Sequence, residues 1–271
     1  MTVDYINEIR AELRHARPLI HCITNPISIH QCANAVLAAG ARPIMAEHPG
    51  EVSEITQTAS ALMLNLGNIT DVRLQSMLLA AETAKRCHIP FLLDAVGISC
   101  SQLRRNYVAD LIQQFTPSVI KGNYSEICTL SDETYRASGV DASADATVEK
   151  TVQSAVKSAR NYHSVVLASG KSDIITDGKT ICFVQNGTPR LAEITGTGCM
   201  QGALAAAYLS VSDSFSAAVT ACTVLGVCGE MAANECGSGS FFVKLMDHLS
   251  LLSDKDVTAY SKSEEKSIEE F

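Results

Sequence analysis

Several features that would assign a protein to a broad class are absent from this sequence. No stretch reaches the roughly 18 uninterrupted apolar residues that a membrane-spanning helix needs. The start of the chain, MTVDYINEIRAELRHARP, lacks the apolar centre of a secretory signal peptide. We therefore expect a cytoplasmic protein that neither spans a membrane nor is secreted.

Closely spaced cysteine or histidine pairs are absent as well. The chain has ten cysteines but no Cys-x-x-Cys pair and no His-x-x-x-His cluster, so a structural zinc site is not expected. Most of these cysteines lie within apolar runs, where a free thiol behaves as a small hydrophobic group. Because cytosolic thiols stay reduced, we expect free cysteines rather than a disulfide framework.

Clustered positive charge is also missing. The formal net charge is −8 and no run of Lys and Arg stands out, which argues against a nucleic-acid-binding surface. A site for a single nucleotide stays open, because it needs only a local patch. The sequence has no evident linker, repeat or low-complexity segment. Residues 1–271 are therefore expected to form one domain, with a polar tail at 253–271 that frays.

Short apolar runs alternate with longer amphipathic ones along most of the chain. The short runs have the composition of strands buried on both faces, and lie at 19–23, 61–66, 89–95, 117–121 and 164–168. Residues 172–186 predict a hairpin that turns at Asp177-Gly178. This alternation predicts an α/β fold with a mostly parallel central sheet and helices on both faces.

Three helical segments are predicted with some detail. Residues 70–88 form an amphipathic helix with Thr70 as its N-cap, and residues 143–163 repeat the scheme. After about residue 198 the strands are expected to stop. The segment 214–235 is apolar nearly all round, so we expect it at the centre of the packing.

A glycine-rich turn meets a predicted helix in EITGTGCMQGALAAAYL, residues 193–209. Gly196 and Gly198 allow a tight turn and a close approach to a ligand, and the helix start offers free N–H groups to an anion. Thr195 and Thr197 are expected to cap the helix through their hydroxyls. A plain tight turn before a core helix explains the same pattern, because Gly-x-Gly alone is a weak signal.

Polar side chains follow two of the predicted strands. In open α/β sheets ligands bind at the carboxyl ends of the strands, where Asp94 and the pair Asn123 and Glu126 are expected to lie. Their oxygens suit a hard cation such as Mg²⁺. Because an unpaired carboxylate at the end of an apolar strand is costly, Asp94 is expected near a cation or near Lys121. Alternatively, Asn123 and Glu126 form a capping box, and Asp94 is a helix or turn cap.

The segments HCITNPIS (21–28) and RPIMAEHPGE (42–51) carry a possible pocket. Asn25 precedes a proline in a turn signal, and Met45 with Pro49 supplies an apolar wall, which together suit a small apolar ring. His21 and His30 are candidates for a general base. We interpret both as structural residues, since nothing in the sequence orients either ring.

Taken together and in this order, these motifs resemble hydroxyethylthiazole kinases of the ribokinase-like superfamily, over nearly the whole chain. The resemblance rests on HCITNPISIHQCANAVLAAGARPIMAEHPGEV, LLDAVG, KGNYSEI, ITDG, ITGTGCMQGALAAA and CGSGSFFVKLMD. It implies a ribokinase-like three-layer sandwich. It also implies ATP-dependent phosphorylation of 4-methyl-5-(2-hydroxyethyl)thiazole in thiamine salvage, by a homotrimer with active sites between subunits.

The resemblance also implies roles for individual residues. The implied anion hole and catalytic residues are Gly196, Thr197, Gly198 and Cys199. The implied substrate pocket comprises Asn25, Met45 and Gly196. The implied ATP contacts are Lys121, Ser169 and Asn123, and the implied Mg²⁺-linked acids are Asp94 and Glu126.

Two departures from the family pattern stand out. Ala95 replaces the proline of the usual Asp-Pro-Val-Gly, so the loop loses a fixed φ but keeps its acid. ASGK at 168–171 replaces the usual Thr-Gly-Glu, so Ser169 keeps a hydroxyl while Lys171 reverses a charge. We expect little functional cost from Ala95, and we expect the changes at Ser169 and Lys171 to affect the nucleotide contacts rather than the reaction.

Many ribokinase-like kinases have an aspartate where this chain has Cys199. A thiol beside the N–H groups that begin a helix is more readily deprotonated, so Cys199 is expected to act as a modest base or hydrogen-bond partner of the substrate hydroxyl. Three alternatives stay open: a related kinase or dehydratase, such as a hydroxymethylpyrimidine kinase, a cysteine-nucleophile hydrolase that pairs Cys199 with His21 or His30, and a non-catalytic binding protein.

Overall fold

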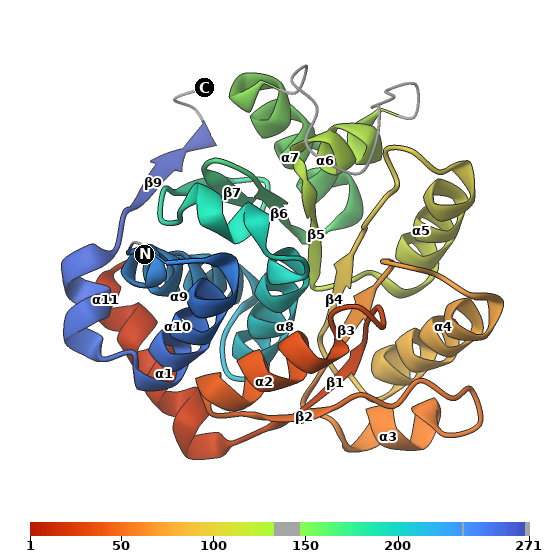
Figure 1. Ribbon diagram of the computed structural model, residues 1–271. Coiled ribbons are helices and arrows are strands. Elements are labelled where there is room, and N and C mark those ends of the chain that lie inside the picture. The colour runs from red at the N-terminus through yellow and green to blue at the C-terminus, as the bar shows by residue number, and fades with distance from the viewer. Residues whose placement is uncertain (133–146, 235, 269–271) are drawn as a thin grey trace.

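The computed structural model describes residues 1–132, 147–234 and 236–268, and its centre is one twisted sheet (Figure 1). The strands lie in the order β2-β1-β3-β4-β5-β6-β7-β8-β9. They are parallel from β2 to β6, and β7, β8 and β9 add to the β6 edge in antiparallel fashion. The strand bounds are β1 Leu19–Ile23, β2 Arg42–Ile44, β3 Ala61–Asn65, β4 Phe91–Asp94, β5 Val119–Asn123, β6 Val165–Ser169, β7 Asp173–Thr176, β8 Thr180–Val184 and β9 Ser263–Ser267.

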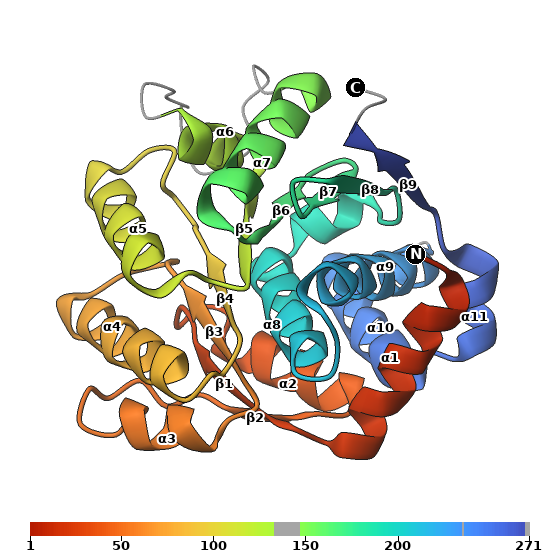
Figure 2. The ribbon, with the colours of Figure 1, turned by 180° about the vertical axis from the view of Figure 1, so that it is seen from behind.

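Two layers of helices cover the sheet, one on each face (Figures 1 and 2). On one face lie α1 (Val3–Ala16), α2 (Ile29–Ala39), α8 (Thr197–Leu209), α9 (Ser214–Ala232), α10 (Ser238–Leu251) and α11 (Asp254–Tyr260). On the other lie α3 (Val52–Thr58), α4 (Asp71–Arg86), α5 (Gln102–Phe115), α6 (Tyr124–Ser131) and α7 (Val148–Tyr162). A short 3₁₀ helix, η1 (Pro189–Glu193), leads into α8. The predicted three-layer α/β architecture is confirmed.

The predicted strands and hairpin are present within a few residues of their expected bounds, but the tail differs. Strand β9 lies in the segment that we expected to fray, and it follows residue 198, after which no strand was predicted. It pairs with β8 from Val184 opposite Ser263 to Thr180 opposite Ser267. Its sequence SEEKS is polar because it is an edge strand held by backbone hydrogen bonds rather than by apolar burial.

The two amphipathic helices begin at side-chain caps. The Thr70 hydroxyl accepts from the Arg73 N–H, as the sequence predicts. Helix α7 starts later than predicted, because the Thr147 hydroxyl accepts from the Lys150 N–H and so fixes its first turn. The part of the predicted helix at 143–146 lies outside the described residues.

Helix α9 is, like α8, largely enclosed within the first layer. It is long and apolar enough to cross a membrane, yet 83% of its most apolar window is buried inside the protein. It packs against α8, α10, α11 and the strands β7 and β8. This is the environment of a core helix, and it confirms the predicted central position.

Candidate active site

The register of three parallel strands places three polar side chains in one row at their carboxyl ends. Asn65 of β3 lies opposite Asp94 of β4, and Asp94 lies opposite Lys121 of β5. Each is two residues beyond an apolar side chain that packs into the α8 layer, so strand alternation points all three toward α8. All three are buried in a part of the sheet that is otherwise apolar.

Helix α8 begins beside this row. Its N-cap Gly196 has φ +93°, a left-handed conformation that favours glycine. A Cβ at Gly198 would lie 3.9 Å from Lys121 Nζ, and one at Gly202 would lie 3.4 Å from an Asp94 carboxylate oxygen. The glycines therefore let the start of α8 come close to Lys121 and Asp94.

The expected hydroxyl caps of α8 are not formed. Among the described residues no side chain caps the helix, and the Thr197 hydroxyl instead donates to the carbonyls of Leu191 (2.8 Å), in the preceding 3₁₀ helix, and of Ile194 (3.2 Å), just after it. Thr195 is exposed. Because no hydroxyl occupies the helix start, its N–H groups are available to an anion.

Lys121 and Asp94 form a buried ion pair. Lys121 Nζ lies 3.2 and 3.3 Å from the two carboxylate oxygens of Asp94, which confirms the sequence alternative of a lysine partner. Burial is the largest single effect and would lower the pKa of Lys121, but the charge and hydrogen bond of Asp94, together with the nearby Cys199 and Glu126, outweigh it and raise the pKa. The lysine therefore stays charged where an anion can reach it.

Asn123 and Glu126 form the capping box that the sequence offered as an alternative. Asn123 Oδ1 accepts from the Glu126 N–H at 2.9 Å, and Glu126 Oε2 accepts from the Asn123 N–H at 2.7 Å. The other oxygen, Oε1, accepts from the Gly97 N–H at 2.6 Å. Burial raises the pKa of Glu126 to about 7, against the effect of these two donors.

The DAVG loop is fixed by two backbone donors. Besides the Gly97 bond to Glu126, the Ala95 N–H donates to the Lys121 carbonyl at 2.8 Å. A proline has no N–H and could not make this bond. The replacement of proline by Ala95 is therefore accompanied by a hydrogen bond that ties the loop after β4 to β5.

The Cys199 thiol faces two amides. Asn25 Nδ2 lies 3.2 Å from Sγ and Asn65 Nδ2 lies 3.4 Å from it. Asn65 Nδ2 also donates to Asp94 Oδ2 at 2.8 Å, so Asn65 links the thiol to the Asp94 carboxylate. Our sequence reasoning missed Asn65, although a polar residue in the apolar run ALMLNL at a strand end was a usable signal.

Neither candidate histidine contacts the thiol in the described structure. His21 is buried, with Nδ1 2.9 Å from Thr56 Oγ1 and Nε2 2.8 Å from the Ala46 carbonyl. Burial lowers the pKa of His21, which keeps its ring neutral. His30 lies exposed on α2 and bonds with Asn34. Both rings thus have structural surroundings rather than the place of a base.

Met45 follows β2 and is half-buried against the core on the α8 side. No hydrogen bond or ion pair among the described residues links it to Cys199, so the structure brings it to the same sheet edge without joining it to the polar network. Ser169 lies opposite Asn123 at the end of β6, and its hydroxyl donates to the Gly122 carbonyl at 3.3 Å. Lys171 is exposed.

A third buried carboxylate, besides Asp94 and Glu126, was not predicted from the sequence. Asp173 begins β7 and accepts from the Gly170 N–H at 3.0 Å and from Gln201 Nε2 at 2.6 Å. Burial raises its pKa. The residue thereby joins the turn that follows Ser169 to helix α8.

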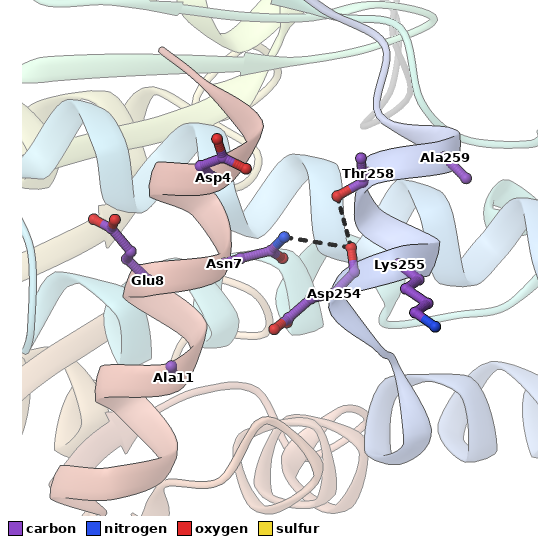
Figure 3. Close-up of a pocket in the computed structure, with 8 residues that line it drawn as sticks. All are labelled: Asp4, Asn7, Glu8, Ala11, Asp254, Lys255, Thr258 and Ala259. Atoms are coloured by element: carbon purple, nitrogen blue, oxygen red, sulfur yellow. Dashed lines mark hydrogen bonds between the residues drawn. The ribbon is translucent and has the colours of Figure 1, made fainter.

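The described residues contain no cluster of three or more His, Cys, Asp or Glu that could hold a metal ion. The site itself contains two of the predicted metal-binding carboxylates, Asp94 and Glu126. A separate surface pocket lies between α1 and α11, where Asn7 donates to the Asp254 carbonyl (Figure 3). None of the predicted site residues lines it.

The comparisons with known proteins show the family of the chain. Residues 10–255 match the model of the hydroxyethylthiazole kinase family. Hydroxyethylthiazole kinase 2 of Clostridium botulinum is 43% identical over 252 residues, covering 91% of this chain and 95% of that protein. Hydroxyethylthiazole kinase 1 of Methanosphaera stadtmanae is 38% identical, covering 96% of this chain and 97% of that protein.

Solved structures give the same result. A hydroxyethylthiazole kinase protein from Pyrococcus horikoshii OT3 superposes with a TM-score of 0.90 at 32% identity, covering 97% of this chain and all of that one. The pyridoxal kinase of Staphylococcus aureus, at 11% identity and a TM-score of 0.65, shares the fold alone. With its family match, its relatives and its three-layer fold, the chain belongs to the hydroxyethylthiazole kinase family.

Proposed function

We propose that this chain transfers the γ-phosphoryl group of ATP to the hydroxyl of 4-methyl-5-(2-hydroxyethyl)thiazole, a step of thiamine salvage. The observation that carries the proposal is the buried Lys121–Asp94 pair beside the uncapped, glycine-rich start of α8. A positive side chain and free helix N–H groups together suit a transferring phosphoryl group, whose negative charge must be neutralised in the transition state. The thiol of Cys199 lies at the same helix start.

The phosphate contacts follow from this arrangement. Gly196, Thr197 and Gly198 would form the anion hole through their backbone N–H groups. Lys121 would neutralise phosphate charge, while Ser169 and Asn123, opposite each other on β6 and β5, would lie on the nucleotide side. This placement suits a nucleotide that approaches from the carboxyl ends of the strands.

The donor set fits Mg²⁺ in its usual phosphate-bound form. Such a magnesium ion is held by one or two carboxylates, with substrate phosphates and water supplying the other ligands. Asp94 and Glu126 would be these carboxylates. When bound, the ion would neutralise charge on the nucleotide phosphates.

On the acceptor side, Asn25 and Met45 would line the pocket for the thiazole ring, with Gly196 close by. We propose that Cys199 accepts a hydrogen bond from the substrate hydroxyl or takes its proton. Because phosphoryl transfer is largely dissociative, early deprotonation of the alcohol contributes less than positioning, and a modest base suffices. No covalent intermediate on Cys199 is proposed.

We also propose that the chain works in the cytoplasm as a homotrimer. Support comes from large apolar side chains left exposed on two helices that pack together, Leu37 on α2 and Val243 on α10, and from Ile27 in the loop beside Asn25. Sedimentation velocity gives the test. A single species of three times the chain mass is expected, and a monomer at micromolar concentration would contradict the trimer.

The reaction is tested by ADP release from ATP and Mg²⁺ with hydroxyethylthiazole, with hydroxymethylpyrimidine and without an acceptor. We expect release that depends on the thiazole alcohol. A preference for the pyrimidine would favour the related-kinase alternative. The cysteine-hydrolase alternative would be favoured by two results together. These are the absence of acceptor-dependent ADP release and an iodoacetamide alkylation of Cys199 that is the same with and without ATP.

A further inference from the structure

The side-chain amide of Asn65 is fully occupied. Its Nδ2 donates to Asp94 Oδ2 (2.8 Å) and to Cys199 Sγ (3.4 Å). Its Oδ1 accepts from the Gly67 N–H (2.8 Å) and from Asn25 Nδ2 (3.4 Å). An asparagine side chain has two donor hydrogens and two acceptor lone pairs, so every one has a partner inside the protein.

These partners also fix which way the amide points. The Gly67 N–H can only donate, so Oδ1 must face it, and the Asp94 carboxylate can only accept, so Nδ2 must face Asp94. Gly67 is necessary for this close approach. A Cβ there would lie 2.9 Å from Asn65 Oδ1 and 2.7 Å from Asn25 Nδ2.

The orientation has a consequence for Cys199. With Nδ2 directed at Sγ from Asn65, and a second Nδ2 directed at it from Asn25, the sulfur accepts two N–H groups. The surroundings of the thiol are thus arranged for a sulfur that acts as a hydrogen-bond acceptor.

The same amide joins the two halves of the site. Lys121 on β5 contacts Asp94 on β4, Asp94 accepts from Asn65 on β3, and Asn65 donates to the thiol at the start of α8. Asn65 is 0% exposed, so no water competes for these bonds from the surface. One buried side chain therefore links the Asp94 carboxylate directly to the Cys199 sulfur.

We propose that Asn65 is a positioning residue for the phosphoryl transfer. It holds the Asp94 carboxylate and the Cys199 sulfur in one arrangement and keeps a donor on the sulfur. The kinetic part of this inference rests on the proposed function, while the hydrogen-bond part does not. Two separate measurements therefore test it.

The first measurement needs no substrate. The rate of iodoacetamide alkylation at Cys199 is followed by peptide mass spectrometry at pH 7.5, with the half-buried Cys87 and Cys236 as internal references. Asn65→Leu removes an N–H donor from the sulfur, and we expect the rate at Cys199 to fall about tenfold, the scale of one lost hydrogen bond. Asn65→Asp, which sets a carboxylate beside the sulfur, lowers it further.

Gly67→Ala gives an independent variant, because its added Cβ displaces both amides while Asn65 itself is unchanged. We expect the same slowing at Cys199. Asn186→Leu is the matched control. This buried asparagine bonds with Glu230, Tyr260 and Lys262 away from the site, and its loss reports the general cost of removing a buried amide.

Selective slowing at Cys199 in both the Asn65 and Gly67 variants, absent from Asn186→Leu, supports the proposal. An unchanged or faster Cys199 reaction in folded Asn65→Leu would overturn it. Equal slowing in Asn186→Leu would also overturn it, because the effect would then follow general loosening.

The second measurement is steady-state kinetics. Asn65→Leu should lower kcat about 100-fold while the KM for ATP stays within about threefold, because positioning acts on the reacting groups rather than on nucleotide binding. A rise in KM alone would contradict positioning. If the wild-type chain shows no kinase activity, the proposed function fails, and alkylation still decides the hydrogen-bond part.

Discussion

The guanidinium of Arg73 donates to both carboxylate oxygens of Glu47, from Nε at 2.9 Å and from Nη2 at 3.2 Å. Arg73 is buried on α4, and its Nη1 donates to the Asn68 carbonyl. The Ser76 hydroxyl donates to the Glu47 carbonyl at 2.7 Å, and the Ala46 carbonyl bonds with His21. The segment after Met45 is therefore held from two sides.

Because Met45 is a proposed wall of the acceptor pocket, loosening this segment should weaken acceptor binding. Arg73→Lys cannot donate to both oxygens at once. We expect the KM for hydroxyethylthiazole to rise about tenfold, since misplaced binding groups lose roughly this much, with the KM for ATP nearly unchanged. Arg42→Lys, at an exposed arginine that bonds with the Arg17 carbonyl, is the control. An equal rise in both KM values would show a global rather than a local effect.

Glu126 predicts a pH dependence of folding stability. Burial raises its pKa to about 7 from 4.5, so the folded protein holds the proton more tightly than the unfolded chain. The resulting stabilisation is complete below pH 4.5 and is lost as the pH rises through 7. The shift corresponds to about 3 kcal/mol.

Glu126→Gln removes this titration. Urea unfolding of both proteins in EDTA should therefore show the variant gaining about 3 kcal/mol relative to the wild type between pH 4 and pH 8. The exposed Glu149→Gln controls for the loss of one negative charge. If the difference in unfolding free energy between the variant and the wild type does not change with pH, burial does not raise the pKa of Glu126.

Gly196 tests the conformation at the helix start. Gly196→Ala places a side chain at φ +93°, with its Cβ 3.0 Å from Ser28 Cβ. A left-handed L-residue costs about 1–2 kcal/mol, so we expect a lower melting temperature and weaker binding of a non-hydrolysable ATP analogue. Gly239→Ala, within α10 and with an added Cβ that meets nothing within 4 Å, should lower neither. Binding that survives unchanged in Gly196→Ala would exclude this turn from the anion hole.

Cys199 tests the proposed base. Cys199→Ala should lower kcat about 100-fold without abolishing turnover, the scale of one lost acid–base group. Cys199→Asp should keep more activity than the alanine variant, because a carboxylate can accept the same proton. Cys87→Ala controls for the loss of a half-buried thiol. If the alanine variant is as inactive as the enzyme without Mg²⁺, or the folded aspartate variant is inactive, the modest-base role is wrong.

The architecture could be predicted from the sequence because buried strands and amphipathic helices have characteristic patterns of apolar residues. It could not give the register that sets Asn65 beside Asp94 and Asp94 beside Lys121, since register depends on which strands become neighbours. Asn65 therefore looked like the end of an apolar run. Strand β9 was missed because its residues are polar and give no apolar pattern. It is held by backbone pairing with β8.

The same contrast applies to single side chains. The capping box of Asn123 and Glu126 could be predicted because both partners lie within one helical turn. Asp173 could not, because its partner Gln201 comes from α8, far along the chain. Thr197 was predicted as a cap from its local sequence, whereas its hydroxyl donates to the preceding 3₁₀ segment.

The enclosure of α9 has a consequence for the order in which the protein is made. Helices α10 and α11, which pack against it, follow it in the chain. During synthesis, a nascent chain that has reached Ala232 therefore presents an apolar helix to water before its cover exists. Premature termination in this region should yield an aggregating, chaperone-bound product rather than a smaller kinase. Truncation here would thus prevent folding, whereas a point mutation at the carboxyl ends of the strands would impair the activity of a folded protein.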